Sequence, residues 1–168
     1  TERGRRTLRK LLDAAGEEFG ARGYHETAIS HITTRAGVGL GTFYVYFKDV
    51  EDAAQQLARE ASSEVPAMVQ LIDGSWEGEE GLQRARALSD AYLEHWERNH
   101  GVLLLRNQAA DRGDKMFLKL RKQALEPLID KLTELITESQ RQGRVAADLH
   151  PYLAASALVS ILEKLSAY

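Results

Sequence analysis

The stretch Thr27–Phe47 reads TAISHITTRAGVGLGTFYVYF, and its pattern predicts two short helices joined by a turn that contains glycine. In the first half, the apolar positions follow the i, i+3, i+7 spacing of a buried helical face: Ile29, Ile32 and Ala36. Gly37 stands where a helix ends in a left-handed residue, a conformation that costs glycine little. Leu40–Phe47 supplies the second helix. Two helices that cross through a short glycine turn form a helix-turn-helix unit, whose second helix fits the major groove of B-DNA.

Charge is unevenly distributed along the 168 residues, although the net charge of −3 alone argues against a nucleic-acid binder. Residues 1–48 carry eight basic and five acidic side chains, a net charge of +3, and residues 49–168 carry a net charge of −6. Five basic residues lie in the first ten positions: Arg3, Arg5, Arg6, Arg9 and Lys10. A basic segment on an acidic remainder favours DNA binding at one end, and a solvated basic tail is the alternative.

Helical periodicity extends over the rest of the chain and predicts an all-α fold of about eight helices without strands. Outside the opening stretch, the expected helices cover residues 4–22, 49–72, 82–99, 102–110, 114–142 and 152–168. Thr27, Asp49 and Asp114 are the expected N-caps, because their side-chain oxygens accept bonds from unpaired backbone N–H groups. Pro66 is expected to kink or restart the helix that contains it.

The composition excludes several classes of protein. Hydrophobic residues make up 43% and charged residues 28%, and the chain has no cysteine, which fits a reducing cytoplasm and removes thiolate metal sites. No apolar run reaches the roughly 18 residues of a membrane span, so we expect no membrane partner. The histidine spacings place no two imidazoles on one helical face, and Ser75 lacks a Gly-x-Ser-x-Gly context. We therefore expect no catalytic residue, no metal site and no cofactor.

From Leu8 to Ala53 the sequence resembles the TetR family of bacterial transcriptional regulators. The resemblance rests on residues at fixed offsets: Phe19, Gly23, Thr27, Ile29, Ile32, Ala36-Gly37-Val38, Gly41-Thr42, Tyr44 and Tyr46-Phe47. It implies a three-helix DNA-binding head over residues 1–48. Over residues 49–168 it implies a linking helix followed by a helical body for ligand binding and dimerisation.

The sequence departs from the family pattern at four places. Gly39 replaces a Ser or Thr that caps the second helix and touches a phosphate, and Val50 replaces a phosphate-binding Lys. Thr33 stands where alanine is common, and its side chain is expected either to add a phosphate hydrogen bond or simply to face solvent. The family generally ends in two packed dimerisation helices, whereas this sequence stops after one, so we expect further sequence beyond Tyr168. Since the chain begins at Thr1 without Met, we also expect a trimmed start.

The resemblance assigns DNA contacts by position. The candidates for positioning on phosphates are Arg3, Arg5, Arg6, Thr27, Thr33, Tyr44 and Lys48. The candidates that face the groove are Leu40, Gly41, Thr42 and Tyr46, whereas Phe43 and Phe47 are expected in the core. The second helix carries no Arg, Asn or Gln for bidentate base readout, but Thr and Leu can contact a thymine methyl group. Specificity is then expected to rest partly on DNA shape and partly on an N-terminal arginine arm formed by Arg3, Arg5 and Arg6.

The body is expected to hold an elongated effector that is apolar or acidic, because one arginine interrupts an apolar lining. The candidate ligand residues are Tyr92, Trp96, Leu103, Arg106, Asn107, Met116 and Phe117. The alternative is that Arg106 pairs with Asp111 or a glutamate and that the two aromatic residues are ordinary core.

The last helix is the candidate for dimerisation, through a face of small and apolar residues: Leu153, Ala154, Ala157, Leu158, Ile161 and Leu165. Its alternative is packing within its own chain only. Together these features predict a regulator, most simply a repressor, that binds double-stranded operator DNA as a homodimer and is released by a small-molecule effector. An enzyme or carrier that uses the helical pocket is one alternative, and an architectural DNA-binding protein without ligand control is the other.

Overall fold

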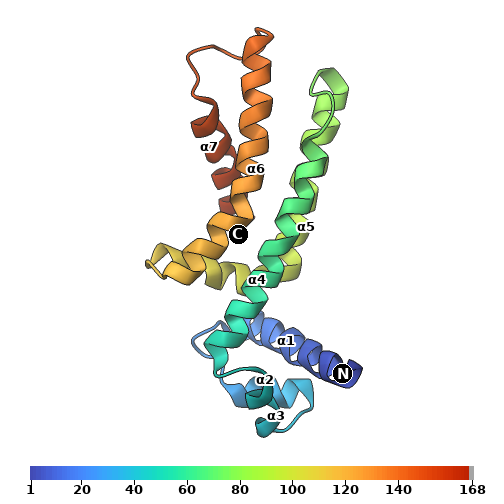
Figure 1. Cartoon of the computed structure of the whole chain (residues 1–168), viewed down its shortest axis with the longest axis vertical. Helices are drawn as coiled ribbons and strands as arrows, with labels where there is room; N and C mark the ends of the chain where they lie inside the picture. Colours follow the sequence, from blue (N-terminus) through green and yellow to red (C-terminus); the bar gives the residue numbers. More distant parts are fainter. Residues whose placement is uncertain (167–168) are drawn as a thin grey trace. The chain divides into compact units, whose positions relative to one another are not determined.

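The computed structural model describes residues 1–166, and over that range its regular elements are helices without strands, which confirms the all-α prediction (Figure 1). A short 3-10 segment, Val69–Ile72, follows the fourth helix. The helices are α1 (Glu2–Arg22), α2 (Ile29–Ala36), α3 (Leu40–Tyr46), α4 (Val50–Met68), α5 (Gly78–Asp111), α6 (Lys115–Arg141) and α7 (Pro151–Leu165). The expected end of the last helix at Tyr168 lies outside the described residues. No helix in that part of the chain is long and apolar enough to cross a membrane.

The chain divides into two compact units, which are described separately. The first unit comprises residues 1–61 and 99–120, and the second comprises residues 62–98 and 121–168. The first unit thus holds α1, α2 and α3 together with the first part of α4, the end of α5 and the start of α6.

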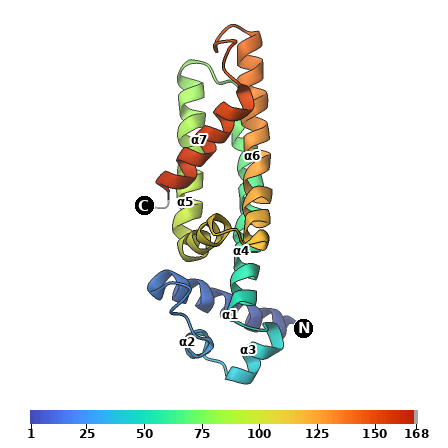
Figure 2. The same ribbon diagram turned by 90° about the vertical axis from the view of Figure 1, so that its left-hand side faces the viewer.

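In the first unit, α1, α2 and α3 lie together (Figure 2), and their buried side chains form a small apolar core. Its fully buried side chains are Leu11, Leu12, Ala15, Phe19, Ile32, Phe43 and Phe47. Each large apolar side chain removed from water contributes about 1.5–3 kcal/mol, so this cluster stabilises the arrangement of three short helices. The expected core positions of Phe43 and Phe47 are confirmed.

The turn between α2 and α3 follows from one glycine. Gly37 adopts a left-handed conformation with φ of 66° and ψ of 38°. Its N–H donates to the Thr34 carbonyl (3.2 Å), and the Val38 N–H donates to the Thr33 carbonyl (3.0 Å). These two bonds satisfy the free carbonyls at the end of α2 in a Schellman arrangement. The predicted helix-turn-helix geometry is therefore present.

A buried carboxylate ties α1 to α2. Glu18 accepts hydrogen bonds from Arg35 Nε on α2 and from Arg22 Nε on α1, each at 2.5 Å. The exposed Glu17 also accepts a bond from Arg35. The Arg35 and Arg22 guanidinium groups lower the pKa of Glu18, against the opposing effect of burial.

Two of the expected N-caps are confirmed and one is wrong. Asp49 accepts a bond from the Asp52 N–H at the start of α4 (2.8 Å), and Asp114 accepts bonds from the Met116 and Phe117 N–H groups at the start of α6. Thr27 is not the cap of α2, because its hydroxyl donates to the Gly23 carbonyl instead (2.8 Å). The α2 helix begins after Ala28.

The helices expected at 82–99 and 102–110 form one helix, α5, which begins at Gly78 and thus four residues earlier than expected. The break appears as a kink, with Asn99 at φ −116° and ψ 16°. Two residues later, Gly101 lies against the backbone of α1, where an added Cβ would stand 2.5 Å from the Gly20 nitrogen. Only glycine fits this close crossing. The helix break expected at Pro66 also shifts, since α4 continues to Met68 before it changes to the 3-10 segment.

In the second unit, α7 lies beside α6 (Figures 1 and 2). Pro151 occupies the first turn of α7, where its missing N–H costs nothing. Arg121 on α6 donates to the buried Glu163 on α7 at 2.7 Å. This ion pair fixes which face of α7 turns inward, and it leaves a row of leucines and isoleucine on the other face.

Candidate nucleic-acid interface

The second helix of the helix-turn-helix, α3, exposes an apolar surface. Leu40 is 53% exposed, Tyr44 56% and Val45 76%. A Cβ added at Gly41 would meet no atom within 4 Å, so the backbone between these side chains is open to close approach. Thr42, another of the predicted groove residues, is only partly exposed. Sequence reasoning missed Val45, although its position four residues after Gly41 places it on the same face.

Tyr46 does not have the position expected for a groove residue. Its side chain is partly buried, and its hydroxyl donates to the Gly4 carbonyl on α1 (3.2 Å). The prediction that Tyr46 faces the groove is therefore wrong. The reason is helical spacing, because a residue three positions after the buried Phe43 turns back toward the core rather than outward.

Two threonines expected at phosphates are also buried. Thr27 and Thr33 are both among the buried polar residues of the first unit. Thr33 donates its hydroxyl to the Ser30 carbonyl (3.2 Å), as Thr27 does to Gly23. Since both hydroxyls donate within the head, the structure argues against their assigned phosphate contacts.

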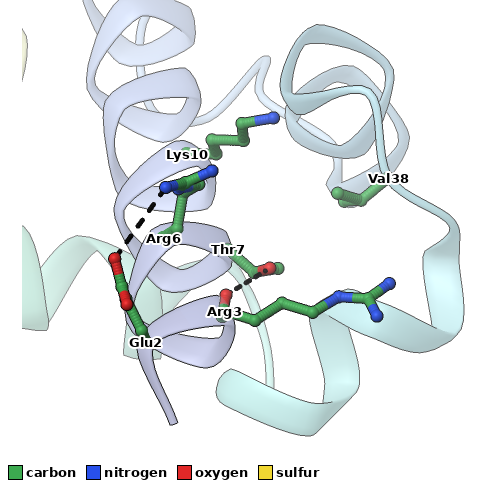
Figure 3. Close-up of a pocket in the computed structure, with 6 residues that line it drawn as sticks. All are labelled: Glu2, Arg3, Arg6, Thr7, Lys10 and Val38. Atoms are coloured by element: carbon green, nitrogen blue, oxygen red, sulfur yellow. Dashed lines mark hydrogen bonds and ion pairs between the residues drawn. The ribbon is translucent and has the colours of Figure 1, made fainter.

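A basic cleft of about 570 Å³ lies between α1 and the turn before α3 (Figure 3). Its lining residues are Glu2, Arg3, Arg6, Thr7, Lys10 and Val38. Val38 stands opposite the side chains of α1, and Arg6 approaches the exposed Glu2 at 4.0 Å. This basic cleft is wide enough and charged enough for an oxyanion such as a phosphate group.

The cleft brings together part of the predicted arginine arm and adds one residue. Arg3 and Arg6 line it, whereas the exposed Arg5 does not. Lys10 completes it, and the signal that marks Lys10 is its spacing of seven and four residues from the two arginines, which places all three on one helical face. Lys48 is exposed at the end of the head, and its backbone N–H donates to Asp52.

The predicted effector residues divide between the two units. Leu103, Arg106, Asn107, Met116 and Phe117 belong to the first unit, and Tyr92 and Trp96 belong to the second. Arg106 is only 1% exposed, and its Nε donates to the Asn107 side chain (3.1 Å). Tyr92, Trp96, Leu103 and Phe117 are buried as well, whereas Met116 is 39% exposed.

The first unit also has a mixed polar and aromatic pocket of about 410 Å³. Phe117 is shared with the predicted effector residues, and the lining includes Tyr24, His25, Glu51, Gln108 and Arg112. Arg112 lies 3.3 Å from His25 Nε2, so this contact joins the end of α5 to the segment between α1 and α2. Burial raises the pKa of Tyr24, and the neighbouring carboxylates add to that effect.

The predicted dimerisation residues lie on the outer face of α7. Leu153, Leu158, Ile161 and Leu165 are all more than half exposed, and Ala157 is exposed beside them. Ala154 is partly buried. An apolar groove of about 340 Å³ adjoins this face, lined by side chains of α5, α6 and α7 that include Leu88, Leu128 and Leu162. Among residues 1–166, no group of three His, Cys, Asp or Glu residues is placed to hold a metal ion.

Comparisons with known proteins agree with this architecture. Residues 11–61 match the family "Bacterial regulatory proteins, tetR family", and residues 68–168 match the family "Tetracyclin repressor-like, C-terminal domain". A Bacillus subtilis protein named "Uncharacterized HTH-type transcriptional regulator YdgC" is 25% identical over 98% of this chain and 81% of its own length. The fatty acid metabolism regulator of the same species is 43% identical over 51 residues, a match that spans 26% of that protein.

Solved structures share the fold at lower identity. The fatty acid degradation regulator FadR from Bacillus halodurans has a TM-score of 0.72 at 22% identity, over 96% of this chain and 82% of that one. FadR from Bacillus subtilis in complex with stearoyl-CoA has a TM-score of 0.66 at 21% identity, over 94% of this chain and 84% of that one. The two family matches together span the head and the body. The chain therefore belongs to the TetR family, and it is a helix-turn-helix transcriptional regulator rather than an enzyme.

Proposed function

We propose that this regulator acts in the cytoplasm as a repressor, binds an operator as a homodimer and leaves it when an acyl-type effector binds the helical body. The observation that carries the proposal is the combination, within the first unit, of an open face on α3 and a basic cleft on α1. An α helix fits the major groove, and cations beside it neutralise phosphates without reading sequence.

The dimer is inferred from α7. Its exposed leucines and isoleucine form an apolar row, and exposure of such a surface to water is unfavourable. A second copy of the same helix offers a matching surface that would cover it. A two-fold dimer presents two copies of α3 to successive major grooves, about 34–36 Å apart on one side of the duplex. The spacing of the two heads then decides whether both can bind.

The effector class is inferred from chemistry and from one relative. Arg106 is a buried cation that donates to Asn107, in a stretch of α5 that also contains the buried Leu103 and Leu105. A cation in a stretch of this kind suits a long apolar molecule with an anionic group. The Bacillus subtilis FadR structure contains stearoyl-CoA, a molecule of that kind. A long-chain acyl thioester is therefore the first effector to test on this chain.

Contacts within the first unit can transmit a movement caused by effector binding to the DNA-binding head. Residues 99–120 belong to the same compact unit as the helix-turn-helix. Gly101 meets the α1 backbone with no room for a Cβ, and Arg112 contacts His25 beside the end of α1. A displacement of the end of α5 is then passed on to α1, because a close-packed contact transmits movement rather than absorbing it.

The proposal has a thermodynamic requirement. An effector that takes operator occupancy from nearly full to nearly empty must prefer the released state by about 5.5 kcal/mol. Linkage requires operator DNA to weaken effector binding by the same factor. Equal effector affinity with and without DNA is incompatible with this mechanism for that effector.

The test is a fluorescence anisotropy titration with duplexes from the DNA upstream of the protein's own gene. Stearoyl-CoA is expected to release the duplex, whereas free coenzyme A at the same concentration leaves it bound. Arg106→Met is expected to retain DNA binding and to lose the response, with Arg86→Met on the surface of α5 as the matched control. Binding to DNA that no acyl thioester affects would favour a different effector or the architectural alternative.

A further inference from the structure

The exposed face of α3 lacks the groups with which proteins usually read base pairs. Its seven residues, LGTFYVY, include no Arg, Lys, Asn, Gln, His, Asp or Glu. The bidentate contacts that identify guanine and adenine in the major groove need such side chains. The polar atoms that remain on the side chains of this helix are the hydroxyls of Thr42, Tyr44 and Tyr46, and Tyr46 already donates to Gly4.

What α3 does expose is hydrocarbon. Leu40 and Val45 flank the open backbone at Gly41, and Val45 has the highest exposed fraction, 76%, among the large apolar side chains that lie at the surface. A helix turns by about 100° per residue, so Leu40, Gly41, Tyr44 and Val45 share one arc of its surface. An arc of this kind in water is unfavourable unless a partner covers it.

The surroundings of this arc identify nucleic acid as the partner. Tyr46 on α3 bonds to Gly4 on α1, so the α1 segment with the cations of the basic cleft runs directly beside α3. Val38, two residues before α3, lines the same cleft. The cleft with Arg3, Arg6 and Lys10 therefore adjoins the start of α3, where the apolar strip begins at Leu40. Cations next to an apolar strip complement a duplex, whose phosphate rows flank a groove of base edges.

Only one base-pair edge offers an apolar group to such a strip. In the major groove, thymine presents its C5-methyl, whereas the other bases present donors and acceptors. The minor groove, about 6 Å wide, cannot admit a helix that is about 10–12 Å across with its side chains. The geometry therefore points to the major groove and to thymine.

We propose that α3 recognises thymine methyl groups in the major groove, with Leu40 and Val45 as the residues that determine specificity. This inference rests on the proposed binding of an operator and names what the operator must present. Each half-site carries thymines positioned under Leu40 and under Val45, and Gly41 allows the helix backbone to approach the edge between them. Tyr44 borders the strip and keeps its hydroxyl available for a phosphate.

The test begins with a selection by the full-length chain from two randomised duplex pools, one made with thymidine and one with deoxyuridine. The pools differ only in the C5-methyl group. The thymidine pool is expected to yield an enriched sequence with thymines in each half, and the deoxyuridine pool is expected to yield none of comparable affinity. Enrichment of the same sequence from both pools, with equal affinity, overturns the proposal.

Single substitutions in the selected duplex then locate the contacts. Replacing a contacted thymine by uracil should weaken binding by about fourfold, the factor expected for one buried methyl-sized group. Replacement by 5-methylcytosine should retain most of the affinity that cytosine loses, because the methyl group remains. If cytosine and 5-methylcytosine weaken binding equally at every thymine, polar groups are being read and the proposal fails.

Variants connect each methyl group to a side chain. In Val45→Ala the uracil penalty at one thymine should disappear, and in Leu40→Ala the penalty at another should disappear. Thr34→Ala, an exposed residue on α2, is the matched control and should keep both penalties. Because all three side chains are exposed, these variants are expected to unfold at the temperature of the wild type.

The outcomes separate this proposal from the proposed function. If no duplex is enriched from the thymidine pool, operator binding itself fails. If duplexes are enriched but no variant changes a uracil penalty, operator binding stands and the methyl readout is wrong. If Leu40→Ala and Val45→Ala change the oligomeric state and leave DNA affinity intact, the face is a protein contact, which also overturns the proposal.

Discussion

Two helices of this regulator, α3 and α7, leave large apolar side chains in water, yet their surroundings differ. On α3, Leu40, Tyr44 and Val45 lie in a head of net charge +3, beside the basic cleft on α1. On α7, the exposed row lies in an acidic body, and the only charged residues of the helix are Glu163 and Lys164. Glu163 is buried and bonded to Arg121.

The comparison teaches that exposed hydrocarbon alone does not identify a partner. A strip in a basic head, next to a cleft with three cations, complements the phosphates and base edges of DNA. A strip in an acidic body, with Lys164 as the one basic residue of its helix, complements another apolar protein surface. The apolar groove beside α7, which belongs to the same second unit, extends that surface toward α5 and α6. We therefore assign α3 to the operator and α7 to the second copy, and the following experiments are designed to break or sharpen that assignment.

The largest expected effect comes from a charge placed on α7. Ile161→Asp should convert the dimer to a monomer, because a carboxylate buried in an apolar interface loses its hydration without gaining a partner. Operator affinity should fall by about 10²–10⁴-fold, the advantage that linking two binding heads supplies. Sedimentation velocity and anisotropy measure the two changes.

The control for that variant is Ser160→Asp, which adds the same charge at the edge of the exposed row. It should leave both the mass and the operator affinity close to those of the wild type. If Ile161→Asp remains a dimer, α7 is not the dimer interface, and the assignment of α7 to the second copy is wrong.

Removal of the cations beside α3 should have the next largest effect. The triple variant Arg3→Ala, Arg6→Ala and Lys10→Ala should weaken binding to every duplex, because phosphate contacts carry no sequence information. The slope of log affinity against log salt concentration should fall by about 0.9 for each phosphate that the variant no longer neutralises. An equivalent triple variant on the body, Arg86→Ala, Lys122→Ala and Arg141→Ala, should retain the wild-type slope. Equal slopes for the two triple variants would show that the basic cleft does not bind DNA phosphates.

Tyr44→Ala should weaken operator binding several-fold without unfolding the head, since more than half of this side chain is exposed and its hydroxyl lies at the surface. Tyr44→Phe separates the hydroxyl from the ring, and an intermediate loss is expected if both contribute. Anisotropy titration measures affinity, and thermal unfolding checks the fold. An unchanged affinity for Tyr44→Ala would leave Leu40 and Val45 as the only side chains of α3 argued to touch DNA.

A smaller effect is expected from acid on the head. Because Arg35 and Arg22 lower the pKa of Glu18 below its ordinary value of 4.5, the Glu18 carboxylate stabilises the fold above that pH. The contribution is lost as the pH falls from 4.5 through the lower pKa of the folded state. Glu18→Gln should therefore flatten the dependence of Tm on pH in this acid range. Glu17→Gln, which alters an exposed carboxylate bonded to the same Arg35, should keep the wild-type dependence.

Much of the fold could be predicted because its signals are local. Gly37, Asp49 and Asp114 were predictable from backbone chemistry, since left-handed φ and helix caps depend on one residue and its immediate neighbours. The continuity of α5 could not be predicted in this way. Asn99 and Gly101 look like a helix end, but the glycine serves a close crossing with Gly20, far away in sequence.

The candidate site was predictable to the same extent. Leu40 and Tyr44 are exposed as the helical spacing implies, whereas burial of the Thr27 and Thr33 hydroxyls depends on packing between helices. Lys10 and Val45 were not predicted from the sequence as DNA-binding residues, for two different reasons. Lys10 belongs to a cleft that forms only when α1 meets the turn before α3, and Val45 is an apolar residue of the kind that sequence patterns assign to the core.

The smallest expected effect tests the residue on α3 that the structure moved from the groove to the core. Tyr46→Phe removes a single hydroxyl that donates to the Gly4 carbonyl, so the free energy of unfolding should fall by about 0.5–1.5 kcal/mol. Operator affinity should remain that of the wild type, because the ring still packs and the exposed face of α3 is unchanged. Chemical denaturation and anisotropy measure the two quantities. A fall in affinity like that of Tyr44→Ala, at unchanged stability, would return Tyr46 to the groove and make α3 a more polar reader than its exposed face indicates.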